Sequence, residues 1–213
     1  MPLHNRRSFV SVLASFAGAA ALDRQASAQA AARPAAAGQF DLTWFDAFKG
    51  QHKQMYDYGT WDLSDDNRPL RYVKNYLDTY RDVFGLQSPD INTTVGVSRA
   101  IAINLSDAMW QKYKIGERYK IADPTTKQPA VRNIFLSDGD ISVKAMQARG
   151  TVFWQCNVAL GLVAQQLAQT SGTPVADVRA DLVAGLNLGV RLVPSHVMAI
   201  GIAQEHGFTY MKT

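Results

Sequence analysis

The stretch Gly150-Thr-Val-Phe-Trp-Gln-Cys-Asn-Val-Ala-Leu160 (GTVFWQCNVAL) joins two patterns of secondary structure. Residues 151–156 are mostly β-branched or aromatic, which is typical of a strand. From Val158 onward, apolar residues recur at the spacing of a helix, which Gly172 ends. A strand that passes directly into a helix is the repeating unit of parallel sheets, so this stretch predicts an α/β fold.

The rest of the C-terminal half repeats this alternation. Thr173-Pro174 is a helix start with a capping hydroxyl and proline at the first position. Residues 189–194 form a short strand stopped by proline, and Ser195 can cap a helix that Gly207 ends before a closing strand over 208–211. Strands that alternate this closely with helices predict a parallel sheet with helices on its faces.

The N-terminal half is predicted to follow the same plan with less regular elements. We expect strands over residues 54–61 and 91–103, a helix over 69–84 that Gly85 ends, and further helices from Ser106 and over 141–149. Between residues 112 and 136 the chain lacks a clean period. This segment predicts a long functional loop or a small insertion.

Residues 1–30 have the pattern of an export signal. A basic start with Arg6 and Arg7 precedes a weakly apolar run that is too short to span a bilayer, and small residues surround Ala28. The arginine pair followed by Phe9 and Val10 resembles the twin-arginine signal, and an ordinary secretory signal is the alternative. We expect the chain to be periplasmic or otherwise exported.

The remaining chain is predicted to be a single domain. Residues 31–40 are an Ala/Pro-rich linker, and residues 41–213 are long enough to bury a substantial core. The net charge is +4, and it falls to +2 without residues 1–30, which hold three Arg and one Asp. This charge is too small to indicate nucleic acid or an anionic membrane as a partner. No later apolar run is long enough to serve as a membrane anchor.

Cys156 is the single cysteine, so the chain can form no internal disulfide in an oxidising compartment. It lies at the end of its predicted strand, where parallel sheets collect chemistry. Asn157 could cap the following helix, which would place the sulfur beside helix amides that favour a thiolate. The alternative is a small buried side chain that only fills space.

Other polar residues could complete a site at this edge of the sheet. His196 follows Pro194 at the end of another strand and could act as the proton partner of Cys156, or be a first-turn histidine without a function. A polar and aromatic set could wall a pocket for an anion such as a sulfur oxyanion, or form an ordinary solvated loop. This set comprises Arg99, Asp107, Trp110, Tyr113, Lys114, Arg132 and Asn133.

The sequence lacks several patterns that would indicate other chemistry. It has no glycine-rich phosphate loop, no Cys/His spacing for zinc and no Gly-x-Ser-x-Gly nucleophile elbow. We therefore expect no cofactor and no metal, and the patterns leave open whether the protein is an enzyme.

Three blocks of sequence resemble the DsrE/DsrF-like family, in that family's order and spacing. They are residues 146–160 (MQARGTVFWQCNVAL), 189–195 (GVRLVPS) and 203–210 (AQEHGFTY). The family pattern is a glycine-led strand ending in Cys-x-x-x-Leu, a Gly-Val-x-Val-Val-Pro strand, and a closing Gln-x-x-Gly-Tyr/Phe-x-Tyr.

This resemblance implies a compact three-layer α/β fold with a mostly parallel five-stranded sheet, assembled as trimers or hexamers. It implies that Cys156 carries sulfur as a persulfide in sulfur oxidation or relay, between donor and acceptor proteins. Asp107, Trp110 and Arg132-Asn133 resemble positions of the exported branch, whereas the family usually has a small residue near His196. Two hypotheses follow: a sulfur-handling protein, or a non-catalytic exported homo-oligomer that binds a ligand or partner while Cys156 is structural.

Overall fold

The computed structural model describes residues 40–59, 68–137 and 139–213. These residues belong to one compact unit, Ala37–Thr213. The predicted export signal over 1–30, most of the linker over 31–40, and Trp61 at the predicted end of the first strand lie outside the described residues.

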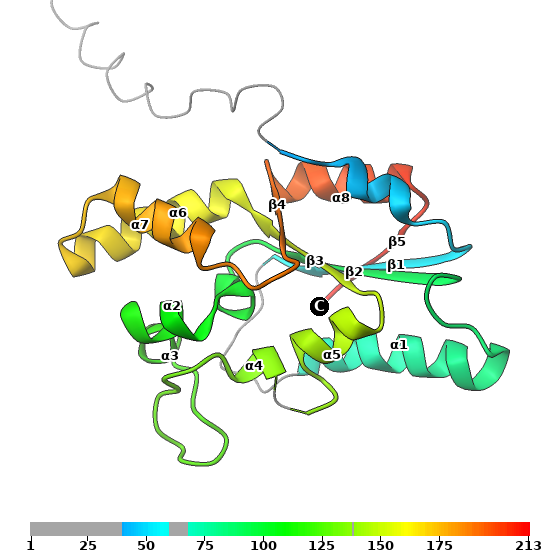
Figure 1. Ribbon diagram of the computed structural model, residues 1–213, viewed down its shortest axis with the longest axis horizontal. Helices are drawn as coiled ribbons and strands as arrows, with labels where there is room; N and C mark the ends of the chain where they lie inside the picture. Colours follow the sequence, from blue (N-terminus) through cyan, green and yellow to red (C-terminus); the bar gives the residue numbers. More distant parts are fainter. Residues whose placement is uncertain (1–39, 60–67, 138) are drawn as a thin grey trace, which may run out of the picture. The chain divides into compact units, whose positions relative to one another are not determined.

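The described chain forms a sheet of five parallel strands, which confirms the predicted α/β class. The strands are β1 (His52–Tyr58), β2 (Ile91–Val97), β3 (Val152–Cys156), β4 (Arg191–Val193) and β5 (Thr209–Lys212), in the order β4-β3-β2-β1-β5 (Figure 1). Every pairing is parallel. All seven residues of the central strand β2 are buried because helices cover both faces of the sheet.

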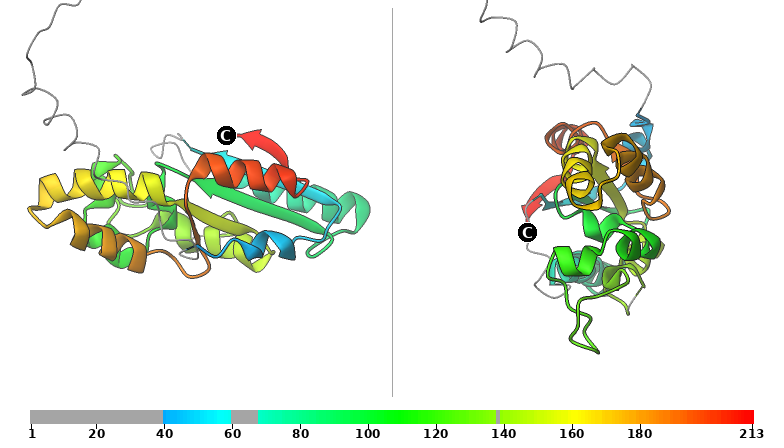
Figure 2. Two further views of the ribbon diagram at one scale, coloured as in Figure 1. Left: turned by 90° about the horizontal axis from the view of Figure 1, so that it is seen from above. Right: turned by 90° about the vertical axis from the view of Figure 1, so that its left-hand side faces the viewer.

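Helices and short 3-10 turns connect the strands. They are η2 (Thr43–Ala47), α1 (Arg68–Phe84), η3 (Ile101–Asn104), α2 (Asp107–Lys112), α3 (Ile115–Arg118), α4 (Ile134–Ser137), α5 (Val143–Ala148), α6 (Asn157–Ser171), α7 (Val175–Ala184) and α8 (His196–Glu205). α1 and α5 lie on one side of the sheet, and η2 and α8 lie on the other (Figure 1). Seen from above, α8 lies over the strands (Figure 2). The fold therefore has three layers.

Each face of the sheet has its own apolar core. On one face, the predicted apolar stripe of α1 is buried through Leu70, Val73 and Leu77. On the other face, the Trp154 ring lies 6.1 Å from Trp44 and 6.0 Å from Phe45 of η2, measured between ring centroids. η2 thus covers part of the face on which α8 packs. On the opposite face, the apolar residues of α1 recur at helical spacing and therefore all point toward the sheet.

The second strand is shorter than predicted. β2 ends at Val97, and the chain then forms η3 instead of continuing as a strand to residue 103. A side chain from a distant loop holds this turn: Nδ2 of Asn133 donates to the carbonyl oxygens of Ala102, Ile103 and Leu105. These carbonyl groups are satisfied by a side-chain amide, so they need no neighbouring strand.

The segment over 112–136 contains α3 and the start of α4, with an isolated bridge between Ala122 and Pro129, which fits the predicted small insertion better than the predicted long loop. One further expectation needs correction. α7 begins at Val175, with the extended Pro174 as its N-cap and no side-chain cap, so the Thr173 hydroxyl does not have the predicted role. Gly172 does end α6, in the left-handed conformation at φ +70°.

Gly96 in β2 lies next to two large side chains, those of Trp154 from β3 and His196 from α8. A Cβ atom added here would lie 2.5 Å from Trp154 Cζ2 and 2.8 Å from His196 Cε1. Trp154 is also the register partner of Gly96 on the next strand. Glycine at this position therefore provides the space that both rings fill.

We predict that Gly96→Ala destabilises the protein by about 1–3 kcal/mol, because the added methyl group overpacks a core formed by Trp154 and His196. The measurement is urea-induced unfolding at neutral pH. Gly161→Ala in α6 is the matched control, since its Cβ would meet nothing within 4 Å and should raise helix stability slightly. Equal stability of Gly96→Ala and wild type would contradict this description of the core.

Candidate functional site

Cys156 is both the last residue of β3 and the N-cap of α6. Its Sγ atom accepts a hydrogen bond from the Ala159 N–H group at 3.4 Å. The sequence had suggested the side chain of Asn157 as the cap. The structure shows that the cap is the sulfur of Cys156. Asn157 is the first helical residue, and its Oδ1 accepts from Nη2 of Arg179 at 2.5 Å.

A second helix also begins at this sulfur atom. The N–H group of His196, the first residue of α8, donates to Cys156 Sγ at 3.3 Å. Helix N-termini carry a partial positive charge, so two of them directed at one atom stabilise negative charge there. Cys156 is 4% exposed, so the residue that carries this sulfur is buried.

Both ring nitrogens of His196 have partners. Trp154 Nε1 donates to His196 Nδ1 at 3.1 Å, so the ring proton is on Nε2, which donates to Asp57 Oδ1 at 2.6 Å. His196 is 7% exposed. The proposed pairing of its ring with the thiol is corrected accordingly: His196 contacts Cys156 through its main chain.

Asp57 joins three elements at this edge of the sheet. Besides His196 from α8, it accepts from the Tyr210 hydroxyl of β5 at 2.7 Å and from the N–H of Gly59 at 2.7 Å. Burial alone would raise the pKa of Asp57, but the hydrogen bonds from His196, Tyr210 and Gly59 outweigh it and lower the pKa to about 2. The bond to Asp57 in turn raises the pKa of Tyr210.

The register of the sheet explains why these groups meet. Asp57, Gly96 and Trp154 are register partners on β1, β2 and β3, so they form one row across the sheet. Side chains in such a row lie on the same face. The His196 ring lies over Gly96 and bonds to the residue on each side of it.

The sequence patterns did not select Asp57 or Trp154 for the site, and they included Tyr210 only in the closing strand and in the family-like block over 203–210. A signal for Asp57 was present, since a carboxylate inside the apolar run Met55-Tyr-Asp-Tyr58 is unusual in a central strand. For Trp154 no such signal exists, because an aromatic residue in a strand most often only packs.

A pocket opens beside the first turns of α6, the helix that Cys156 caps. Its volume is about 350 Å³, and its lining includes Arg99, Tyr119, Ala159 and Leu162. Ala159 is the residue whose N–H donates to Cys156 Sγ. Arg99, one of the predicted binding residues, is exposed and lines this pocket together with Ala159.

Three of the predicted binding residues hold the segment after β2 in place. Asn133 is 1% exposed and uses its amide to bind carbonyl oxygens of η3, while its N–H donates to Asp107 Oδ1 at 2.8 Å. The indole N–H of Trp110 donates to the carbonyl oxygen of Ala102 at 2.9 Å. The polar atoms of Asp107, Trp110 and Asn133 therefore make internal contacts that fix the backbone.

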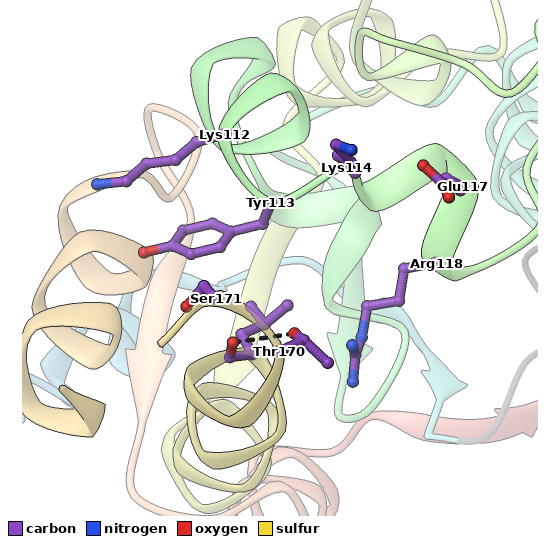
Figure 3. A pocket seen from close by; sticks show the side chains of 8 residues that line it. Lys112, Tyr113, Lys114, Glu117, Arg118, Thr170 and Ser171 are labelled. Carbon is purple, nitrogen blue, oxygen red and sulfur yellow. Dashed lines mark hydrogen bonds between the residues drawn. The ribbon is translucent and has the colours of Figure 1, made fainter. Parts of the chain in front are cut away.

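The other predicted residues lie elsewhere. Arg132 Nη2 is 4.0 Å from Asp123 Oδ2, and Tyr113 and Lys114 line a separate pocket of about 440 Å³ (Figure 3). Figure 3 shows this pocket between the α2–α3 segment and the end of α6. There the Tyr113 hydroxyl donates to Asp181 Oδ2 at 2.5 Å, and Lys112 pairs with the same carboxylate. The predicted set is thus divided between several places.

Among the described residues, no group of three or more His, Cys, Asp or Glu side chains is arranged to hold a metal ion. Within the same ranges, no helix combines the length and apolar character needed to cross a bilayer.

We predict that Asp57 makes the fold sensitive to acid. Because its pKa in the folded protein is below that of an unfolded aspartate, the unfolded chain binds more protons and stability is lost as the pH falls from about 4 toward about 2. Asp57→Asn should remove about 1–2 kcal/mol of this acid-induced loss. The measurement is the free energy of unfolding in urea at pH 6 and pH 3.

Asp140→Asn is the control for this experiment, since the Asp140 side chain is 77% exposed and makes no contact with Asp57 among the interactions described. Its acid-induced loss should equal that of wild type. An Asp57→Asn variant with the wild-type loss between pH 6 and pH 3 would show that Asp57 does not carry the effect.

Comparison with known proteins adds little to this description. No family model matches the chain, and no curated protein matches it. Among solved structures, a protein of unknown function from Methanobacterium thermoautotrophicum is similar, with 15% sequence identity and a TM-score of 0.40. That match covers 78% of this chain and 100% of the other, and a likeness of this degree carries no argument about function.

Proposed function

We propose that this chain is a sulfur-handling protein in which Cys156 carries a sulfane sulfur atom as a persulfide. The observation that carries the proposal is the pair of main-chain N–H groups, from Ala159 and His196, that donate to Cys156 Sγ. Donors at two helix N-termini stabilise a thiolate, and the thiolate is the form of cysteine that attacks sulfur. The resemblance of three sequence blocks to the DsrE/DsrF-like family supports the same function.

The loading step can be written with a polysulfide as the donor. The Cys156 thiolate attacks the terminal sulfur of the polysulfide. A new S–S bond forms to Cys156, and the S–S bond next to the attacked atom breaks. The bond electrons leave with a polysulfide shortened by one sulfur, so the total charge is unchanged. The product is a cysteine persulfide anion, whose terminal sulfur can pass to an acceptor thiolate by the same exchange.

The surroundings of the thiol suit an anionic donor. Arg99 supplies a cationic side chain on the pocket that opens beside α6. A polysulfide is an anion, and a guanidinium group attracts it. Because Cys156 is 4% exposed, loading needs a shift of the first turn of α6 or α8, so it should be slower than for a free thiol.

The alternative function is a non-catalytic module that binds a ligand or partner, in which Cys156 only caps α6. The burial of Cys156 favours this alternative, since a capping and buried thiol needs no reactivity.

For both functions we propose that the protein is an exported homo-oligomer. Val158 and Val197, the second residues of α6 and α8, have exposed apolar side chains, which supports contact with another protein surface.

We predict that purified protein incubated with sodium polysulfide gains 32 Da, about the atomic mass of one sulfur, because the Cys156 thiolate accepts the terminal atom. Intact-mass spectrometry under native, non-reducing conditions is the measurement. Dithiothreitol should remove the added mass, since it reduces a persulfide.

Cys156→Ser is the matched control and should gain no mass, because Cys156 is the single cysteine of the chain. A wild-type protein that gains no sulfur, and whose thiol is alkylated only in denaturant, would overturn the sulfur-handling proposal and favour the structural role.

A further inference from the structure

We propose that Asp57 is a positioning residue for Cys156, acting through His196. The inference rests on the proposed function in that it takes Cys156 Sγ as the working atom. The chain of contacts is short: Asp57 Oδ1 accepts from His196 Nε2 at 2.6 Å, and the N–H of His196 donates to Cys156 Sγ at 3.3 Å. One carboxylate thus fixes the residue that binds the sulfur.

The start of α8 lacks the usual means of fixing a helix N-terminus. Ser195 is its N-cap, yet the Ser195 side chain makes no capping hydrogen bond. The His196 ring supplies the missing constraint, because it is buried and bonded on both sides, to Asp57 and to Trp154. The orientation of the first turn of α8, and with it the N–H directed at Cys156, therefore depends on this ring.

The contacts of Asp57 separate this role from a purely structural one. Oδ1 faces His196, whereas Oδ2 accepts from Tyr210, and the main-chain oxygen of Asp57 accepts from Thr213. The bonds to Tyr210 and Thr213 hold the edge strand β5 and do not involve α8. Removing the Tyr210 hydroxyl therefore tests the β5 connection alone, whereas removing the carboxylate breaks the bonds to His196, to Tyr210 and to the Gly59 N–H group.

Charge and position have opposite effects on the thiol, which gives the test a direction. Removing the negative charge of Asp57 would favour a thiolate at Cys156 by electrostatics alone. Losing the aligned His196 N–H would disfavour it, since that donor stabilises the anion. A fall in the thiolate fraction after loss of the Asp57 side chain can therefore come only from lost positioning.

The titratable and charged groups at this corner of the molecule come from several elements. They are Asp57 from β1, His196 from α8, Tyr210 from β5, Arg99 from the segment after β2, and Arg179 from α7, which binds Asn157. The control variant Tyr210→Phe removes only the Tyr210 hydroxyl from this set, and the control variant Asp57→Asn removes only the Asp57 charge.

The experiment is alkylation of the folded full chain with iodoacetamide, followed by intact-mass spectrometry, which is unambiguous because the chain has a single cysteine. The quantity of interest is the rate at pH 7 divided by the rate at pH 10 for the same variant. A change in access to the thiol affects both rates equally, so the ratio reports the thiolate fraction.

We expect Asp57→Ala to lower this ratio at least threefold, and Tyr210→Phe to keep it within twofold of wild type. Asp57→Asn should also stay within twofold, because its amide oxygen can still accept from His196 Nε2. Should Asp57→Ala fail to fold, Asp57→Leu and His196→Phe, compared at the same two pH values, test the same contact. An unchanged or raised ratio after loss of the contact would overturn the proposal.

This result is independent of sulfur loading. A protein that gains no sulfur from polysulfide but shows the expected fall in ratio would contradict the proposed function and support the role of Asp57. A protein that gains sulfur while the ratio is unchanged in every contact variant would support the proposed function and contradict the role of Asp57.

Discussion

The hydrogen bond between Asp57 Oδ1 and His196 Nε2 connects the end of β1 to the first residue of α8 across the face of the sheet. It is possible because Gly96, on the strand between, has no side chain to occupy the space that the His196 ring fills. Trp154 completes the row by donating to the other ring nitrogen. The placement of α8, and hence of its first N–H group at Cys156, depends on this row of three partners in register.

The same geometry gives Cys156 two roles at once. As the N-cap of α6, its sulfur replaces the oxygen that normally accepts from the first helix amides. As the meeting point of α6 and α8, it receives a second N–H group from His196. A sulfur atom in this position is stabilised as an anion whether or not it reacts, so reactivity depends on how readily the surrounding first turns open.

Periodicity in the sequence was sufficient to predict the parallel sheet, the order of its strands along the chain with the longer helices between them, and the position of Cys156 at a strand end. It could not show that the predicted strand gives way to η3 after Val97, because the carbonyl groups of that turn are bound by Asn133, far along the chain. The sequence also could not predict the hydrogen-bond partners of the His196 ring. Register between parallel strands decides that Asp57, Gly96 and Trp154 form a row, and register is a property of pairing that single-strand patterns do not encode.

Fixation of the His196 ring by Asp57 and Trp154, which orients the His196 N–H group at the thiol, is tested most directly by NMR of the ring nitrogens. A long-range ¹H–¹⁵N correlation spectrum of the folded protein at pH 7 gives the tautomer, and loss of the signals in His196→Gln assigns them. The structure predicts a single neutral tautomer with the proton on Nε2 and an unprotonated Nδ1 that accepts from Trp154. A ring protonated at Nδ1, or one that averages between tautomers, would contradict this account.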